Sequence, residues 1–128
     1  MDHVDLSEKI IGCAYKIYNV LGSGFLESVY EKAFEIELKK LEVSVEMQKK
    51  VNVYYDGQSV GVFIADLVVD NKIIVELKAV KSLAVAHEVQ LVNYLAATEI
   101  SIGLLINFGE SKVEVKRKYL TSNQKLSC

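Results

Sequence analysis

The sequence predicts an α/β (α+β) fold with about five strands flanked by helices, in the order ααβββαββ. Residues up to Leu41 place apolar side chains at helical spacing, whereas from Val43 onward apolar and polar residues alternate as they do in strands. After a third helical pattern, the nearly continuous apolar run Ile100–Phe108 is typical of a central strand that is buried on both faces. We expect one domain over residues 1–120, followed by a polar tail at 121–128.

Two helices are expected before the strands. Asp5 and Glu8 have the spacing of a capping box ahead of an apolar pattern that continues to Leu21, and the glycine that follows is a natural end. The second helix is expected at about Leu26–Leu41, with Glu27 in its first turn. An acid at this position is stabilised by the helix dipole, so its presence has a purely structural explanation.

Short turns separate the remaining elements. Asp56-Gly57 is a strong hairpin signal between the first two strands. Ser82 is expected to cap the third helix, at roughly Val85–Thr98, and Gly109 turns the long apolar strand into the alternating segment Lys112–Tyr119. The chain shows no internal repeat and no domain linker.

The composition indicates a globular chain in a reducing, cytoplasmic setting. Apolar residues make up 51% of the chain and charged residues 25%, and there is no proline. No apolar run approaches the roughly 20 residues of a membrane span, and the N-terminus lacks the pattern of a signal peptide, so no membrane is expected as a partner. The two cysteines, Cys13 and Cys128, do not make a disulfide framework.

The charge is unevenly distributed. The net charge of −2 gives by itself no footprint for nucleic acid. Residues 111–128, however, hold five basic residues against one acid, about +4, which leaves about −6 for the rest of the chain. A basic edge beside an acidic pocket suits a metal-dependent phosphodiesterase, with Lys116 and Arg117 as candidates for holding phosphates. The alternative is a solvated, slightly basic strand and tail.

The stretch Gly61–Val80 carries the candidate site. Asp66 interrupts one apolar run, and Glu76 and Lys78 interrupt the next. Because strand side chains alternate between faces, Glu76 and Lys78 point the same way. Burying an acid and a base among aliphatic residues is costly unless they pair or bind a metal. An exposed strand face is the simpler explanation for Glu-x-Lys taken alone.

The turn between these runs decides whether Asp66 and Glu76 share a face. A two-residue loop would leave Glu76 on the wrong face of the sheet. A three-residue loop at residues 70–72 pairs Val69 with Ile73 and puts Asp66 directly across from Glu76. Since a shift of one residue turns every side chain over, a shared site requires this loop or a bulge.

The pattern Asp66…Glu76-Leu77-Lys78 resembles the signature of the PD-(D/E)XK nuclease superfamily, with Ala65 in place of the usual proline. The helix, three-strand meander, helix and strand are also similar to the core of that superfamily. The resemblance therefore implies a restriction-endonuclease-like core with a mixed central sheet.

A more specific resemblance is to the GxxExxY family within this superfamily. The segment GFLESVY matches the motif for which the family is named, with its fixed positions at Gly24, Glu27 and Tyr30. The segments YEKAFEIEL, ADLVVDNKIIVELKAV, HEVQLVNYL and GLLINFG are similar to the same family in the same order. This resemblance covers roughly residues 5–120.

The resemblance implies metal-dependent hydrolysis of phosphodiester bonds. Asp66 and Glu76 would bind Mg²⁺ or Mn²⁺, with Glu27 as a third carboxylate and the backbone carbonyl of Leu77 as a further ligand. Lys78 is expected to stay protonated beside two acids, where it would position the attacking water and neutralise charge that builds up on the phosphorus centre.

The third expected helix adds two candidates for substrate binding. Gln90 and Tyr94 are similar to the Q-x-x-x-Y motif of RecB-type members, which contacts the nucleic-acid backbone or orients the catalytic lysine. The alternative is core packing for Tyr94 and a structural hydrogen bond for Gln90.

The leading hypothesis is therefore a metal-dependent nuclease that acts on nucleic acid, with DNA favoured over RNA. The alternative is a catalytically silent nucleic-acid- or protein-binding module that keeps the nuclease fold. The acidic bulk and small size leave little surface for wrapping a duplex. A homodimer or a partner protein would supply the missing surface, and exposed apolar area is then expected on the last strand.

Overall fold

The computed structural model describes residues 2–120. Its elements follow the order expected from the sequence, ααβββαββ. They are α1 (His3–Leu21), α2 (Glu27–Lys40), β1 (Val45–Tyr55), β2 (Gln58–Val69), β3 (Ile73–Lys78), α3 (Val85–Thr98), β4 (Ile102–Phe108) and β5 (Val113–Tyr119). The predicted polar tail at 121–128 lies outside the described residues.

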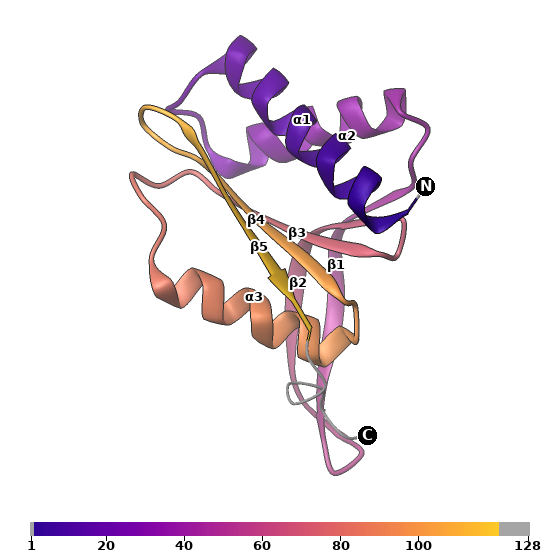
Figure 1. The fold of residues 1–128 in the computed structure, drawn as a ribbon. Coiled ribbons are helices and arrows are strands. Elements are labelled where there is room, and N and C mark those ends of the chain that lie inside the picture. The colour runs from indigo at the N-terminus through magenta and orange to yellow at the C-terminus, as the bar shows by residue number, and fades with distance from the viewer. Residues whose placement is uncertain (1, 121–128) are drawn as a thin grey trace.

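The five strands form one mixed sheet in the order β1-β2-β3-β4-β5. Only β3 and β4 run parallel, because α3 connects them as a crossover, and the other neighbours are antiparallel. Helices α1 and α2 cover one face of the sheet and α3 lies on the other (Figure 1). The predicted fold class, a mixed sheet flanked by helices as in a restriction-endonuclease-like core, is confirmed.

Each face of the sheet has its own apolar core. The larger core lies against α1 and α2 and includes Tyr30, Phe34 and Phe108. The smaller core lies under α3, where Leu91 is fully buried. A Cβ built on Gly103 of β4 would come within 2.8 Å of the Leu91 side chain, so this glycine allows α3 to pack closely on the sheet.

Two helix starts differ from the sequence expectation. The first helix begins one turn early, and its N-cap is Asp2, whose carboxylate accepts a hydrogen bond from the backbone N–H of Asp5 at 2.9 Å. The third helix is capped at Ala84 and not at Ser82; there the Nδ1 atom of His87 accepts a hydrogen bond from the Ala84 N–H at 3.0 Å. Within residues 2–120 no helix is both long and apolar enough to cross a membrane.

Strand β2 departs from regular side-chain alternation at Asp66, so that its two ends present their side chains to different faces of the sheet. Ala65 belongs to the core under α3, whereas Leu67 belongs to the core under α1 and α2, although residues two apart in a regular strand share a face. Across the pair, Gln48 of β1 has a left-handed φ of 50° and is missing from the ladder. Beyond this point β1 and β2 pair only with each other, as a ribbon that projects past the rest of the sheet (Figure 1). We call this ribbon, residues 49–65, the arm.

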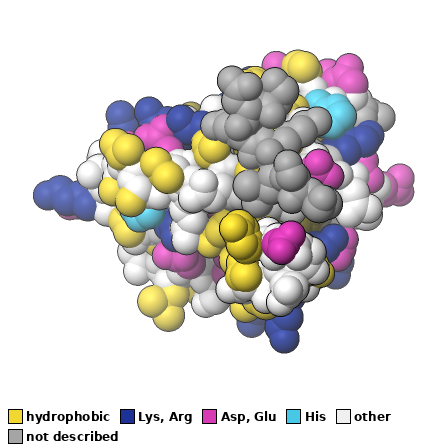
Figure 2. All heavy atoms as spheres, turned by 90° about the horizontal axis from the view of Figure 1, so that it is seen from below, with side chains coloured by type: hydrophobic (Ala, Val, Ile, Leu, Met, Phe, Trp, Pro, Cys, Tyr) yellow, Lys and Arg dark blue, Asp and Glu magenta, His cyan; other side chains and the backbone are white. Residues whose placement is uncertain are grey.

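The arm carries most of the exposed large apolar side chains of the sheet. They are Tyr54, Tyr55, Val60, Val62 and Ile64, whereas β5 contributes only Tyr119 among the described residues. On the last strand, where a partner surface would be sought, exposed large apolar area is thus limited to Tyr119. Figure 2 views the molecule from the end toward which the arm projects and shows hydrophobic groups there between acidic and basic ones.

Candidate active site

The turn between β2 and β3 is the three-residue loop that a shared site requires. Residues 70–72 form the turn, and Val69 pairs with Ile73 as predicted. One step beyond the last pair of the ladder, this register puts Asp66 across from Glu76. The backbone N–H of Asp66 lies 3.4 Å from Oε1 of Glu76 and donates to it. The two acids thus meet where β2 leaves β3.

The side chain of Asp66 replaces a backbone partner at this junction. Its Oδ2 atom accepts a hydrogen bond from the backbone N–H of Leu77 at 2.8 Å, a donor that a continued ladder would pair with the backbone of β2. The N–H and C=O of one residue in an extended strand project toward the same side. The carbonyl of Leu77 therefore also faces the gap beside Asp66.

Glu76 is the most perturbed titratable group of the site. It is only 7% exposed, and by strand alternation it lies on the α3 face together with Ile74. Burial first, and then the charge and the hydrogen bond of Asp66, raise the pKa of Glu76 to about 9. The ammonium group of Lys78 opposes this effect and is outweighed. Without a bound cation, Glu76 therefore keeps its proton at neutral pH.

Lys78 ends β3 on the same face as Glu76, and the chain that follows it is firmly attached to β4. The fully buried Asn107 accepts a hydrogen bond from the Val80 N–H at 2.9 Å and donates to the Val80 carbonyl at 2.8 Å. Asn107 also donates to Glu114 of β5 at 2.9 Å. Among residues 2–120 the ammonium of Lys78 has no hydrogen bond or ion pair.

The glycine and tyrosine of the GxxExxY motif shape the turn before α2. Gly24 has a φ of 100°, which few other residues adopt. The hydroxyl of Tyr30 donates to the Gly22 carbonyl at 2.7 Å and accepts from the Phe25 N–H at 3.4 Å. Its ring is fully buried and stacks on Phe108, with centroids 4.0 Å apart. Both residues thus have a structural role.

The glutamate of the motif, Glu27, is exposed at the first position of α2, and a different acid reaches the site. Glu31, one turn later, accepts a hydrogen bond from the Gln48 amide, which also donates to Oδ1 of Asp66 at 3.4 Å. Burial, and next the charge of Asp66, raise the pKa of Glu31, and Glu27 adds a smaller effect. Sequence reasoning missed Glu31 and Gln48. The available signal was the four-residue spacing of Glu27 and Glu31 on one helix face.

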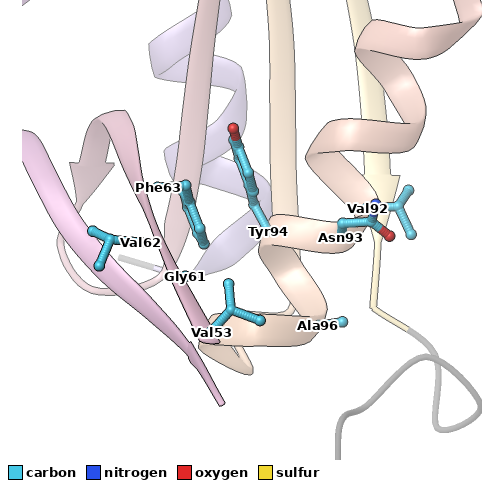
Figure 3. A pocket seen from close by; sticks show the side chains of 8 residues that line it. All are labelled: Val53, Gly61, Val62, Phe63, Val92, Asn93, Tyr94 and Ala96. Atoms are coloured by element: carbon cyan, nitrogen blue, oxygen red, sulfur yellow. The ribbon is translucent and has the colours of Figure 1, made fainter. Parts of the chain in front are cut away.

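Tyr94 of α3 links the acid pair to the arm. Burial, followed by the charges of Glu76 and Asp66, raises the pKa of Tyr94, while a hydrogen bond with Gln90 acts in the opposite direction. Its ring stacks on Phe63 of the arm, with centroids 3.6 Å apart and planes inclined by 1° (Figure 3). Tyr94 therefore lies within the electrostatic reach of the two acids and Gln90 bonds to Tyr94, whereas the substrate-binding role that the motif resemblance implied stays a prediction.

Lys116 and Arg117 lie on opposite faces of β5. Lys116 pairs with Leu105, which packs under α3, so it shares the face of Glu76. Arg117 pairs with Leu104 of the other core, and its guanidinium donates to the hydroxyl of Ser7 on α1 at 3.2 Å. Because neighbouring side chains of a strand project to opposite sides, only Lys116 shares a face with Glu76, and phosphate binding by either residue stays a prediction.

Asp66 and Glu76 are the two acids that meet directly, and Glu31 approaches Asp66 through Gln48. In the chain from residue 2 to residue 120, no three His, Cys, Asp or Glu side chains are arranged to hold a metal ion, and a third carboxylate from Glu27 stays a prediction. The pair itself fits a hard divalent cation. Mg²⁺ is commonly held by one or two carboxylates and keeps several waters. The pKa of Glu76 is raised first by burial and next by the charge of Asp66, and a cation bound between the two carboxyls would oppose the second effect.

Comparisons with known proteins agree with the fold. Residues 4–118 match the family described as the PD-(D/E)XK nuclease superfamily. The chain therefore belongs to the PD-(D/E)XK nuclease superfamily. The further resemblance to the GxxExxY family remains a prediction.

A solved structure shares the fold. The crystal structure of SSO0001 superposes with a TM-score of 0.55 at 18% sequence identity, covering 77% of this chain and 52% of that one. The chain thus spans about half the length of SSO0001, and at this identity the likeness supports the fold alone. No curated protein matches the chain.

Proposed function

We propose that this chain is a metal-dependent nuclease of the GxxExxY family that hydrolyses phosphodiester bonds, with DNA as the favoured substrate and Mg²⁺ or Mn²⁺ as the cofactor. The observation that carries the proposal is the contact between Asp66 and Glu76 at the point where β2 leaves β3. A mostly buried acid pair that retains a proton is a poor structural element, because it costs stability and gains no ion pair. It is a suitable ligand set for a cation.

Each residue of the site has a role in this proposal. Asp66, Glu76 and the carbonyl of Leu77 would hold the cation, and Glu31 would reach it through water. A divalent ion held there polarises the phosphate and lowers the pKa of a water molecule. Lys78, with its ammonium unpaired among the described residues, neutralises the charge that develops on the phosphate oxygens.

The decisive experiment measures cleavage and metal binding on the same protein preparation. Labelled single-stranded DNA, double-stranded DNA and RNA are incubated with Mg²⁺ or Mn²⁺ and with the variants Lys78→Ala and Lys81→Ala. Lys81 is an exposed lysine three positions farther along, which makes it a matched control. We expect Lys78→Ala to reduce the cleavage rate by roughly 100-fold or more. Lys81→Ala should retain the wild-type rate. Equal cleavage by all three proteins would contradict the proposal.

Calorimetry with Mn²⁺ separates the enzyme from a silent binding module. Wild-type protein should bind Mn²⁺ near neutral pH, and Glu76→Ala should not. Glu8→Gln, an exposed acid on α1, is the control and should bind like the wild type. Absence of metal binding together with binding of nucleic acid would favour a module that keeps the nuclease fold without the reaction.

A further inference from the structure

An open groove separates the arm from α3, next to the acid pair. One wall consists of Val53, Gly61 and Phe63 of the arm, and the other of Asn93, Tyr94 and Ala96 of the helix (Figure 3). The groove has a volume of about 570 Å³. It exists because β2 turns over at Asp66 and carries the arm past the edge of β3.

The lining of the groove suits a flat, uncharged group. Every residue that lines it is uncharged, so the groove offers no cation for a phosphate. Most of the lining is apolar, and the stacked rings of Phe63 and Tyr94 provide aromatic surface. The exposed amide of Asn93 supplies both a donor and an acceptor, the combination with which asparagine recognises the edge of a base.

Tyr94 relates the groove to the acid pair. This tyrosine lines the groove, and its hydroxyl is close enough to Glu76 and Asp66 to feel their charges. In Figure 3 the hydroxyl points away from Val53 and Ala96. Along β2, Phe63 lies three residues from Asp66, about 10 Å of extended chain. A base in the groove would thus belong to a nucleotide next to the bond at the acid pair.

Gly61 keeps the groove open. A Cβ built on this residue meets no heavy atom within 4 Å, and Gly61 is paired opposite Val53, the last pair before the register shift between Val53 and Tyr54. Its φ lies outside the left-handed region, so the backbone does not require glycine. A side chain would therefore occupy the groove without disturbing the strand.

We propose that this groove binds one unstacked base of a single-stranded nucleic acid, beside the phosphodiester that lies at the acid pair. The proposal rests on the proposed nuclease function and narrows its substrate class. A base-paired duplex keeps its bases within the stack, whereas a single strand, an unpaired end or a flipped nucleotide presents one. Aromatic and apolar surface of this kind is how proteins hold single strands without reading their sequence.

Binding of labelled oligonucleotides tests this proposal. Fluorescence anisotropy with Mg²⁺ compares a short single strand with the duplex of the same sequence, in the Lys78→Ala background so that neither is cut. Gly61→Val fills the groove, and Val60→Phe adds bulk at the neighbouring position, which does not line it. Asn93→Ala, at an exposed helix position, removes the amide and serves as a second test if Gly61→Val does not fold.

We expect Gly61→Val to weaken binding of the single strand about 5- to 150-fold, the range that stacking of one base corresponds to, while Val60→Phe leaves it unchanged. A series of strands with a single abasic nucleotide should lose affinity at one position only. Equal binding of single strand and duplex, an abasic series without a weak position, or unchanged binding by both groove variants would overturn the proposal.

The outcomes also distinguish this proposal from the nuclease function itself. Metal-dependent cleavage by a Gly61→Val protein in the wild-type Lys78 background, with no loss of affinity for single strands, would overturn the base site and leave the nuclease. Loss of affinity on filling the groove, in a protein that never cleaves, would support the base site and remove the nuclease. If Gly61→Val changes only the molar mass measured by light scattering, the groove binds a second copy of the chain and the base site is overturned.

Discussion

The proton on Glu76 makes a quantitative prediction about stability. The pKa of this carboxyl is raised to about 9 in the folded protein, mainly by burial, whereas an exposed glutamate titrates near 4.5. Because the pKa of Glu76 is higher in the folded than in the unfolded protein, binding of this proton contributes to the free energy of unfolding. The contribution is fully present below about pH 4.5 and is lost as the pH rises through about 9. Within that window the folded chain binds one proton that the unfolded chain has released. The free energy of unfolding should therefore fall by about 1.4 kcal/mol per pH unit.

Glu76→Gln isolates this effect. The amide has the shape of the protonated acid and can donate to Asp66, but it does not titrate. Urea unfolding in the presence of a chelator should give similar stabilities for the two proteins at about pH 5. The variant should be more stable by several kcal/mol at about pH 9, up to about 5 kcal/mol if the whole shift is realised. Glu8→Gln, the same substitution at an exposed position of α1, is the control.

Two results would refute this reasoning. If the difference between wild type and Glu76→Gln is constant from about pH 5 to about pH 9, the carboxyl is not protonated in the folded state. If Mn²⁺ stabilises both proteins equally at about pH 8, the cation does not replace that proton. The expected outcome is stabilisation of the wild type that grows with pH and is absent in the variant, because only an ionised carboxyl binds the metal.

Three further predictions concern residues that hold the site and the fold in place. Gln48→Gly suits the left-handed backbone at that position and removes the amide that bonds Glu31 and Asp66, so calorimetry should show Mn²⁺ affinity reduced about 10- to 100-fold with little loss of stability. Asn107→Ala leaves two backbone groups of Val80 without partners and should lower the free energy of unfolding by about 1–3 kcal/mol in urea titrations. Tyr30→Phe keeps the ring stack but loses the bond to the Gly22 carbonyl, and thermal unfolding should show a cost of about 1 kcal/mol.

Much of the fold could be read from local pattern because the pattern and the tertiary structure agree. The three-residue loop at 70–72 followed from the requirement that Asp66 face Glu76, and the register of β2 and β3 confirms it. The apolar run of β4 likewise indicated a strand covered on both faces, and its residues 103–108 are all buried. In both cases a short-range rule, side-chain alternation, decides the outcome.

The surroundings of the acids could not be read in the same way. The left-handed conformation of Gln48 has no signal in its residue type, because glutamine rarely adopts it. The residue's side chain bonds to Glu31 and Asp66, which come from two elements distant in sequence, so no local pattern could indicate its role. For the same reason the motif spacing pointed to Glu27, whereas the turn of α2 that approaches the sheet carries Glu31. Helix starts were missed where a neighbouring group, Asp2 or His87, provides the cap.

One departure from regular strand geometry accounts for both the acid pair and the groove. The Asp66 carboxylate takes the Leu77 amide that the next residues of β2 would otherwise pair with, so the ladder between β2 and β3 ends there. The carboxylate is thereby held against Glu76, and the rest of β2 turns over with β1 and approaches α3. That turn brings Phe63 onto Tyr94 and leaves Gly61 lining open space. The proposed cation site and the proposed base site thus meet at residue 66 of β2. A regular β2 would still place Asp66 across from Glu76, but its carboxylate would not bond the Leu77 amide and the arm would remain in the sheet, without a groove beside α3.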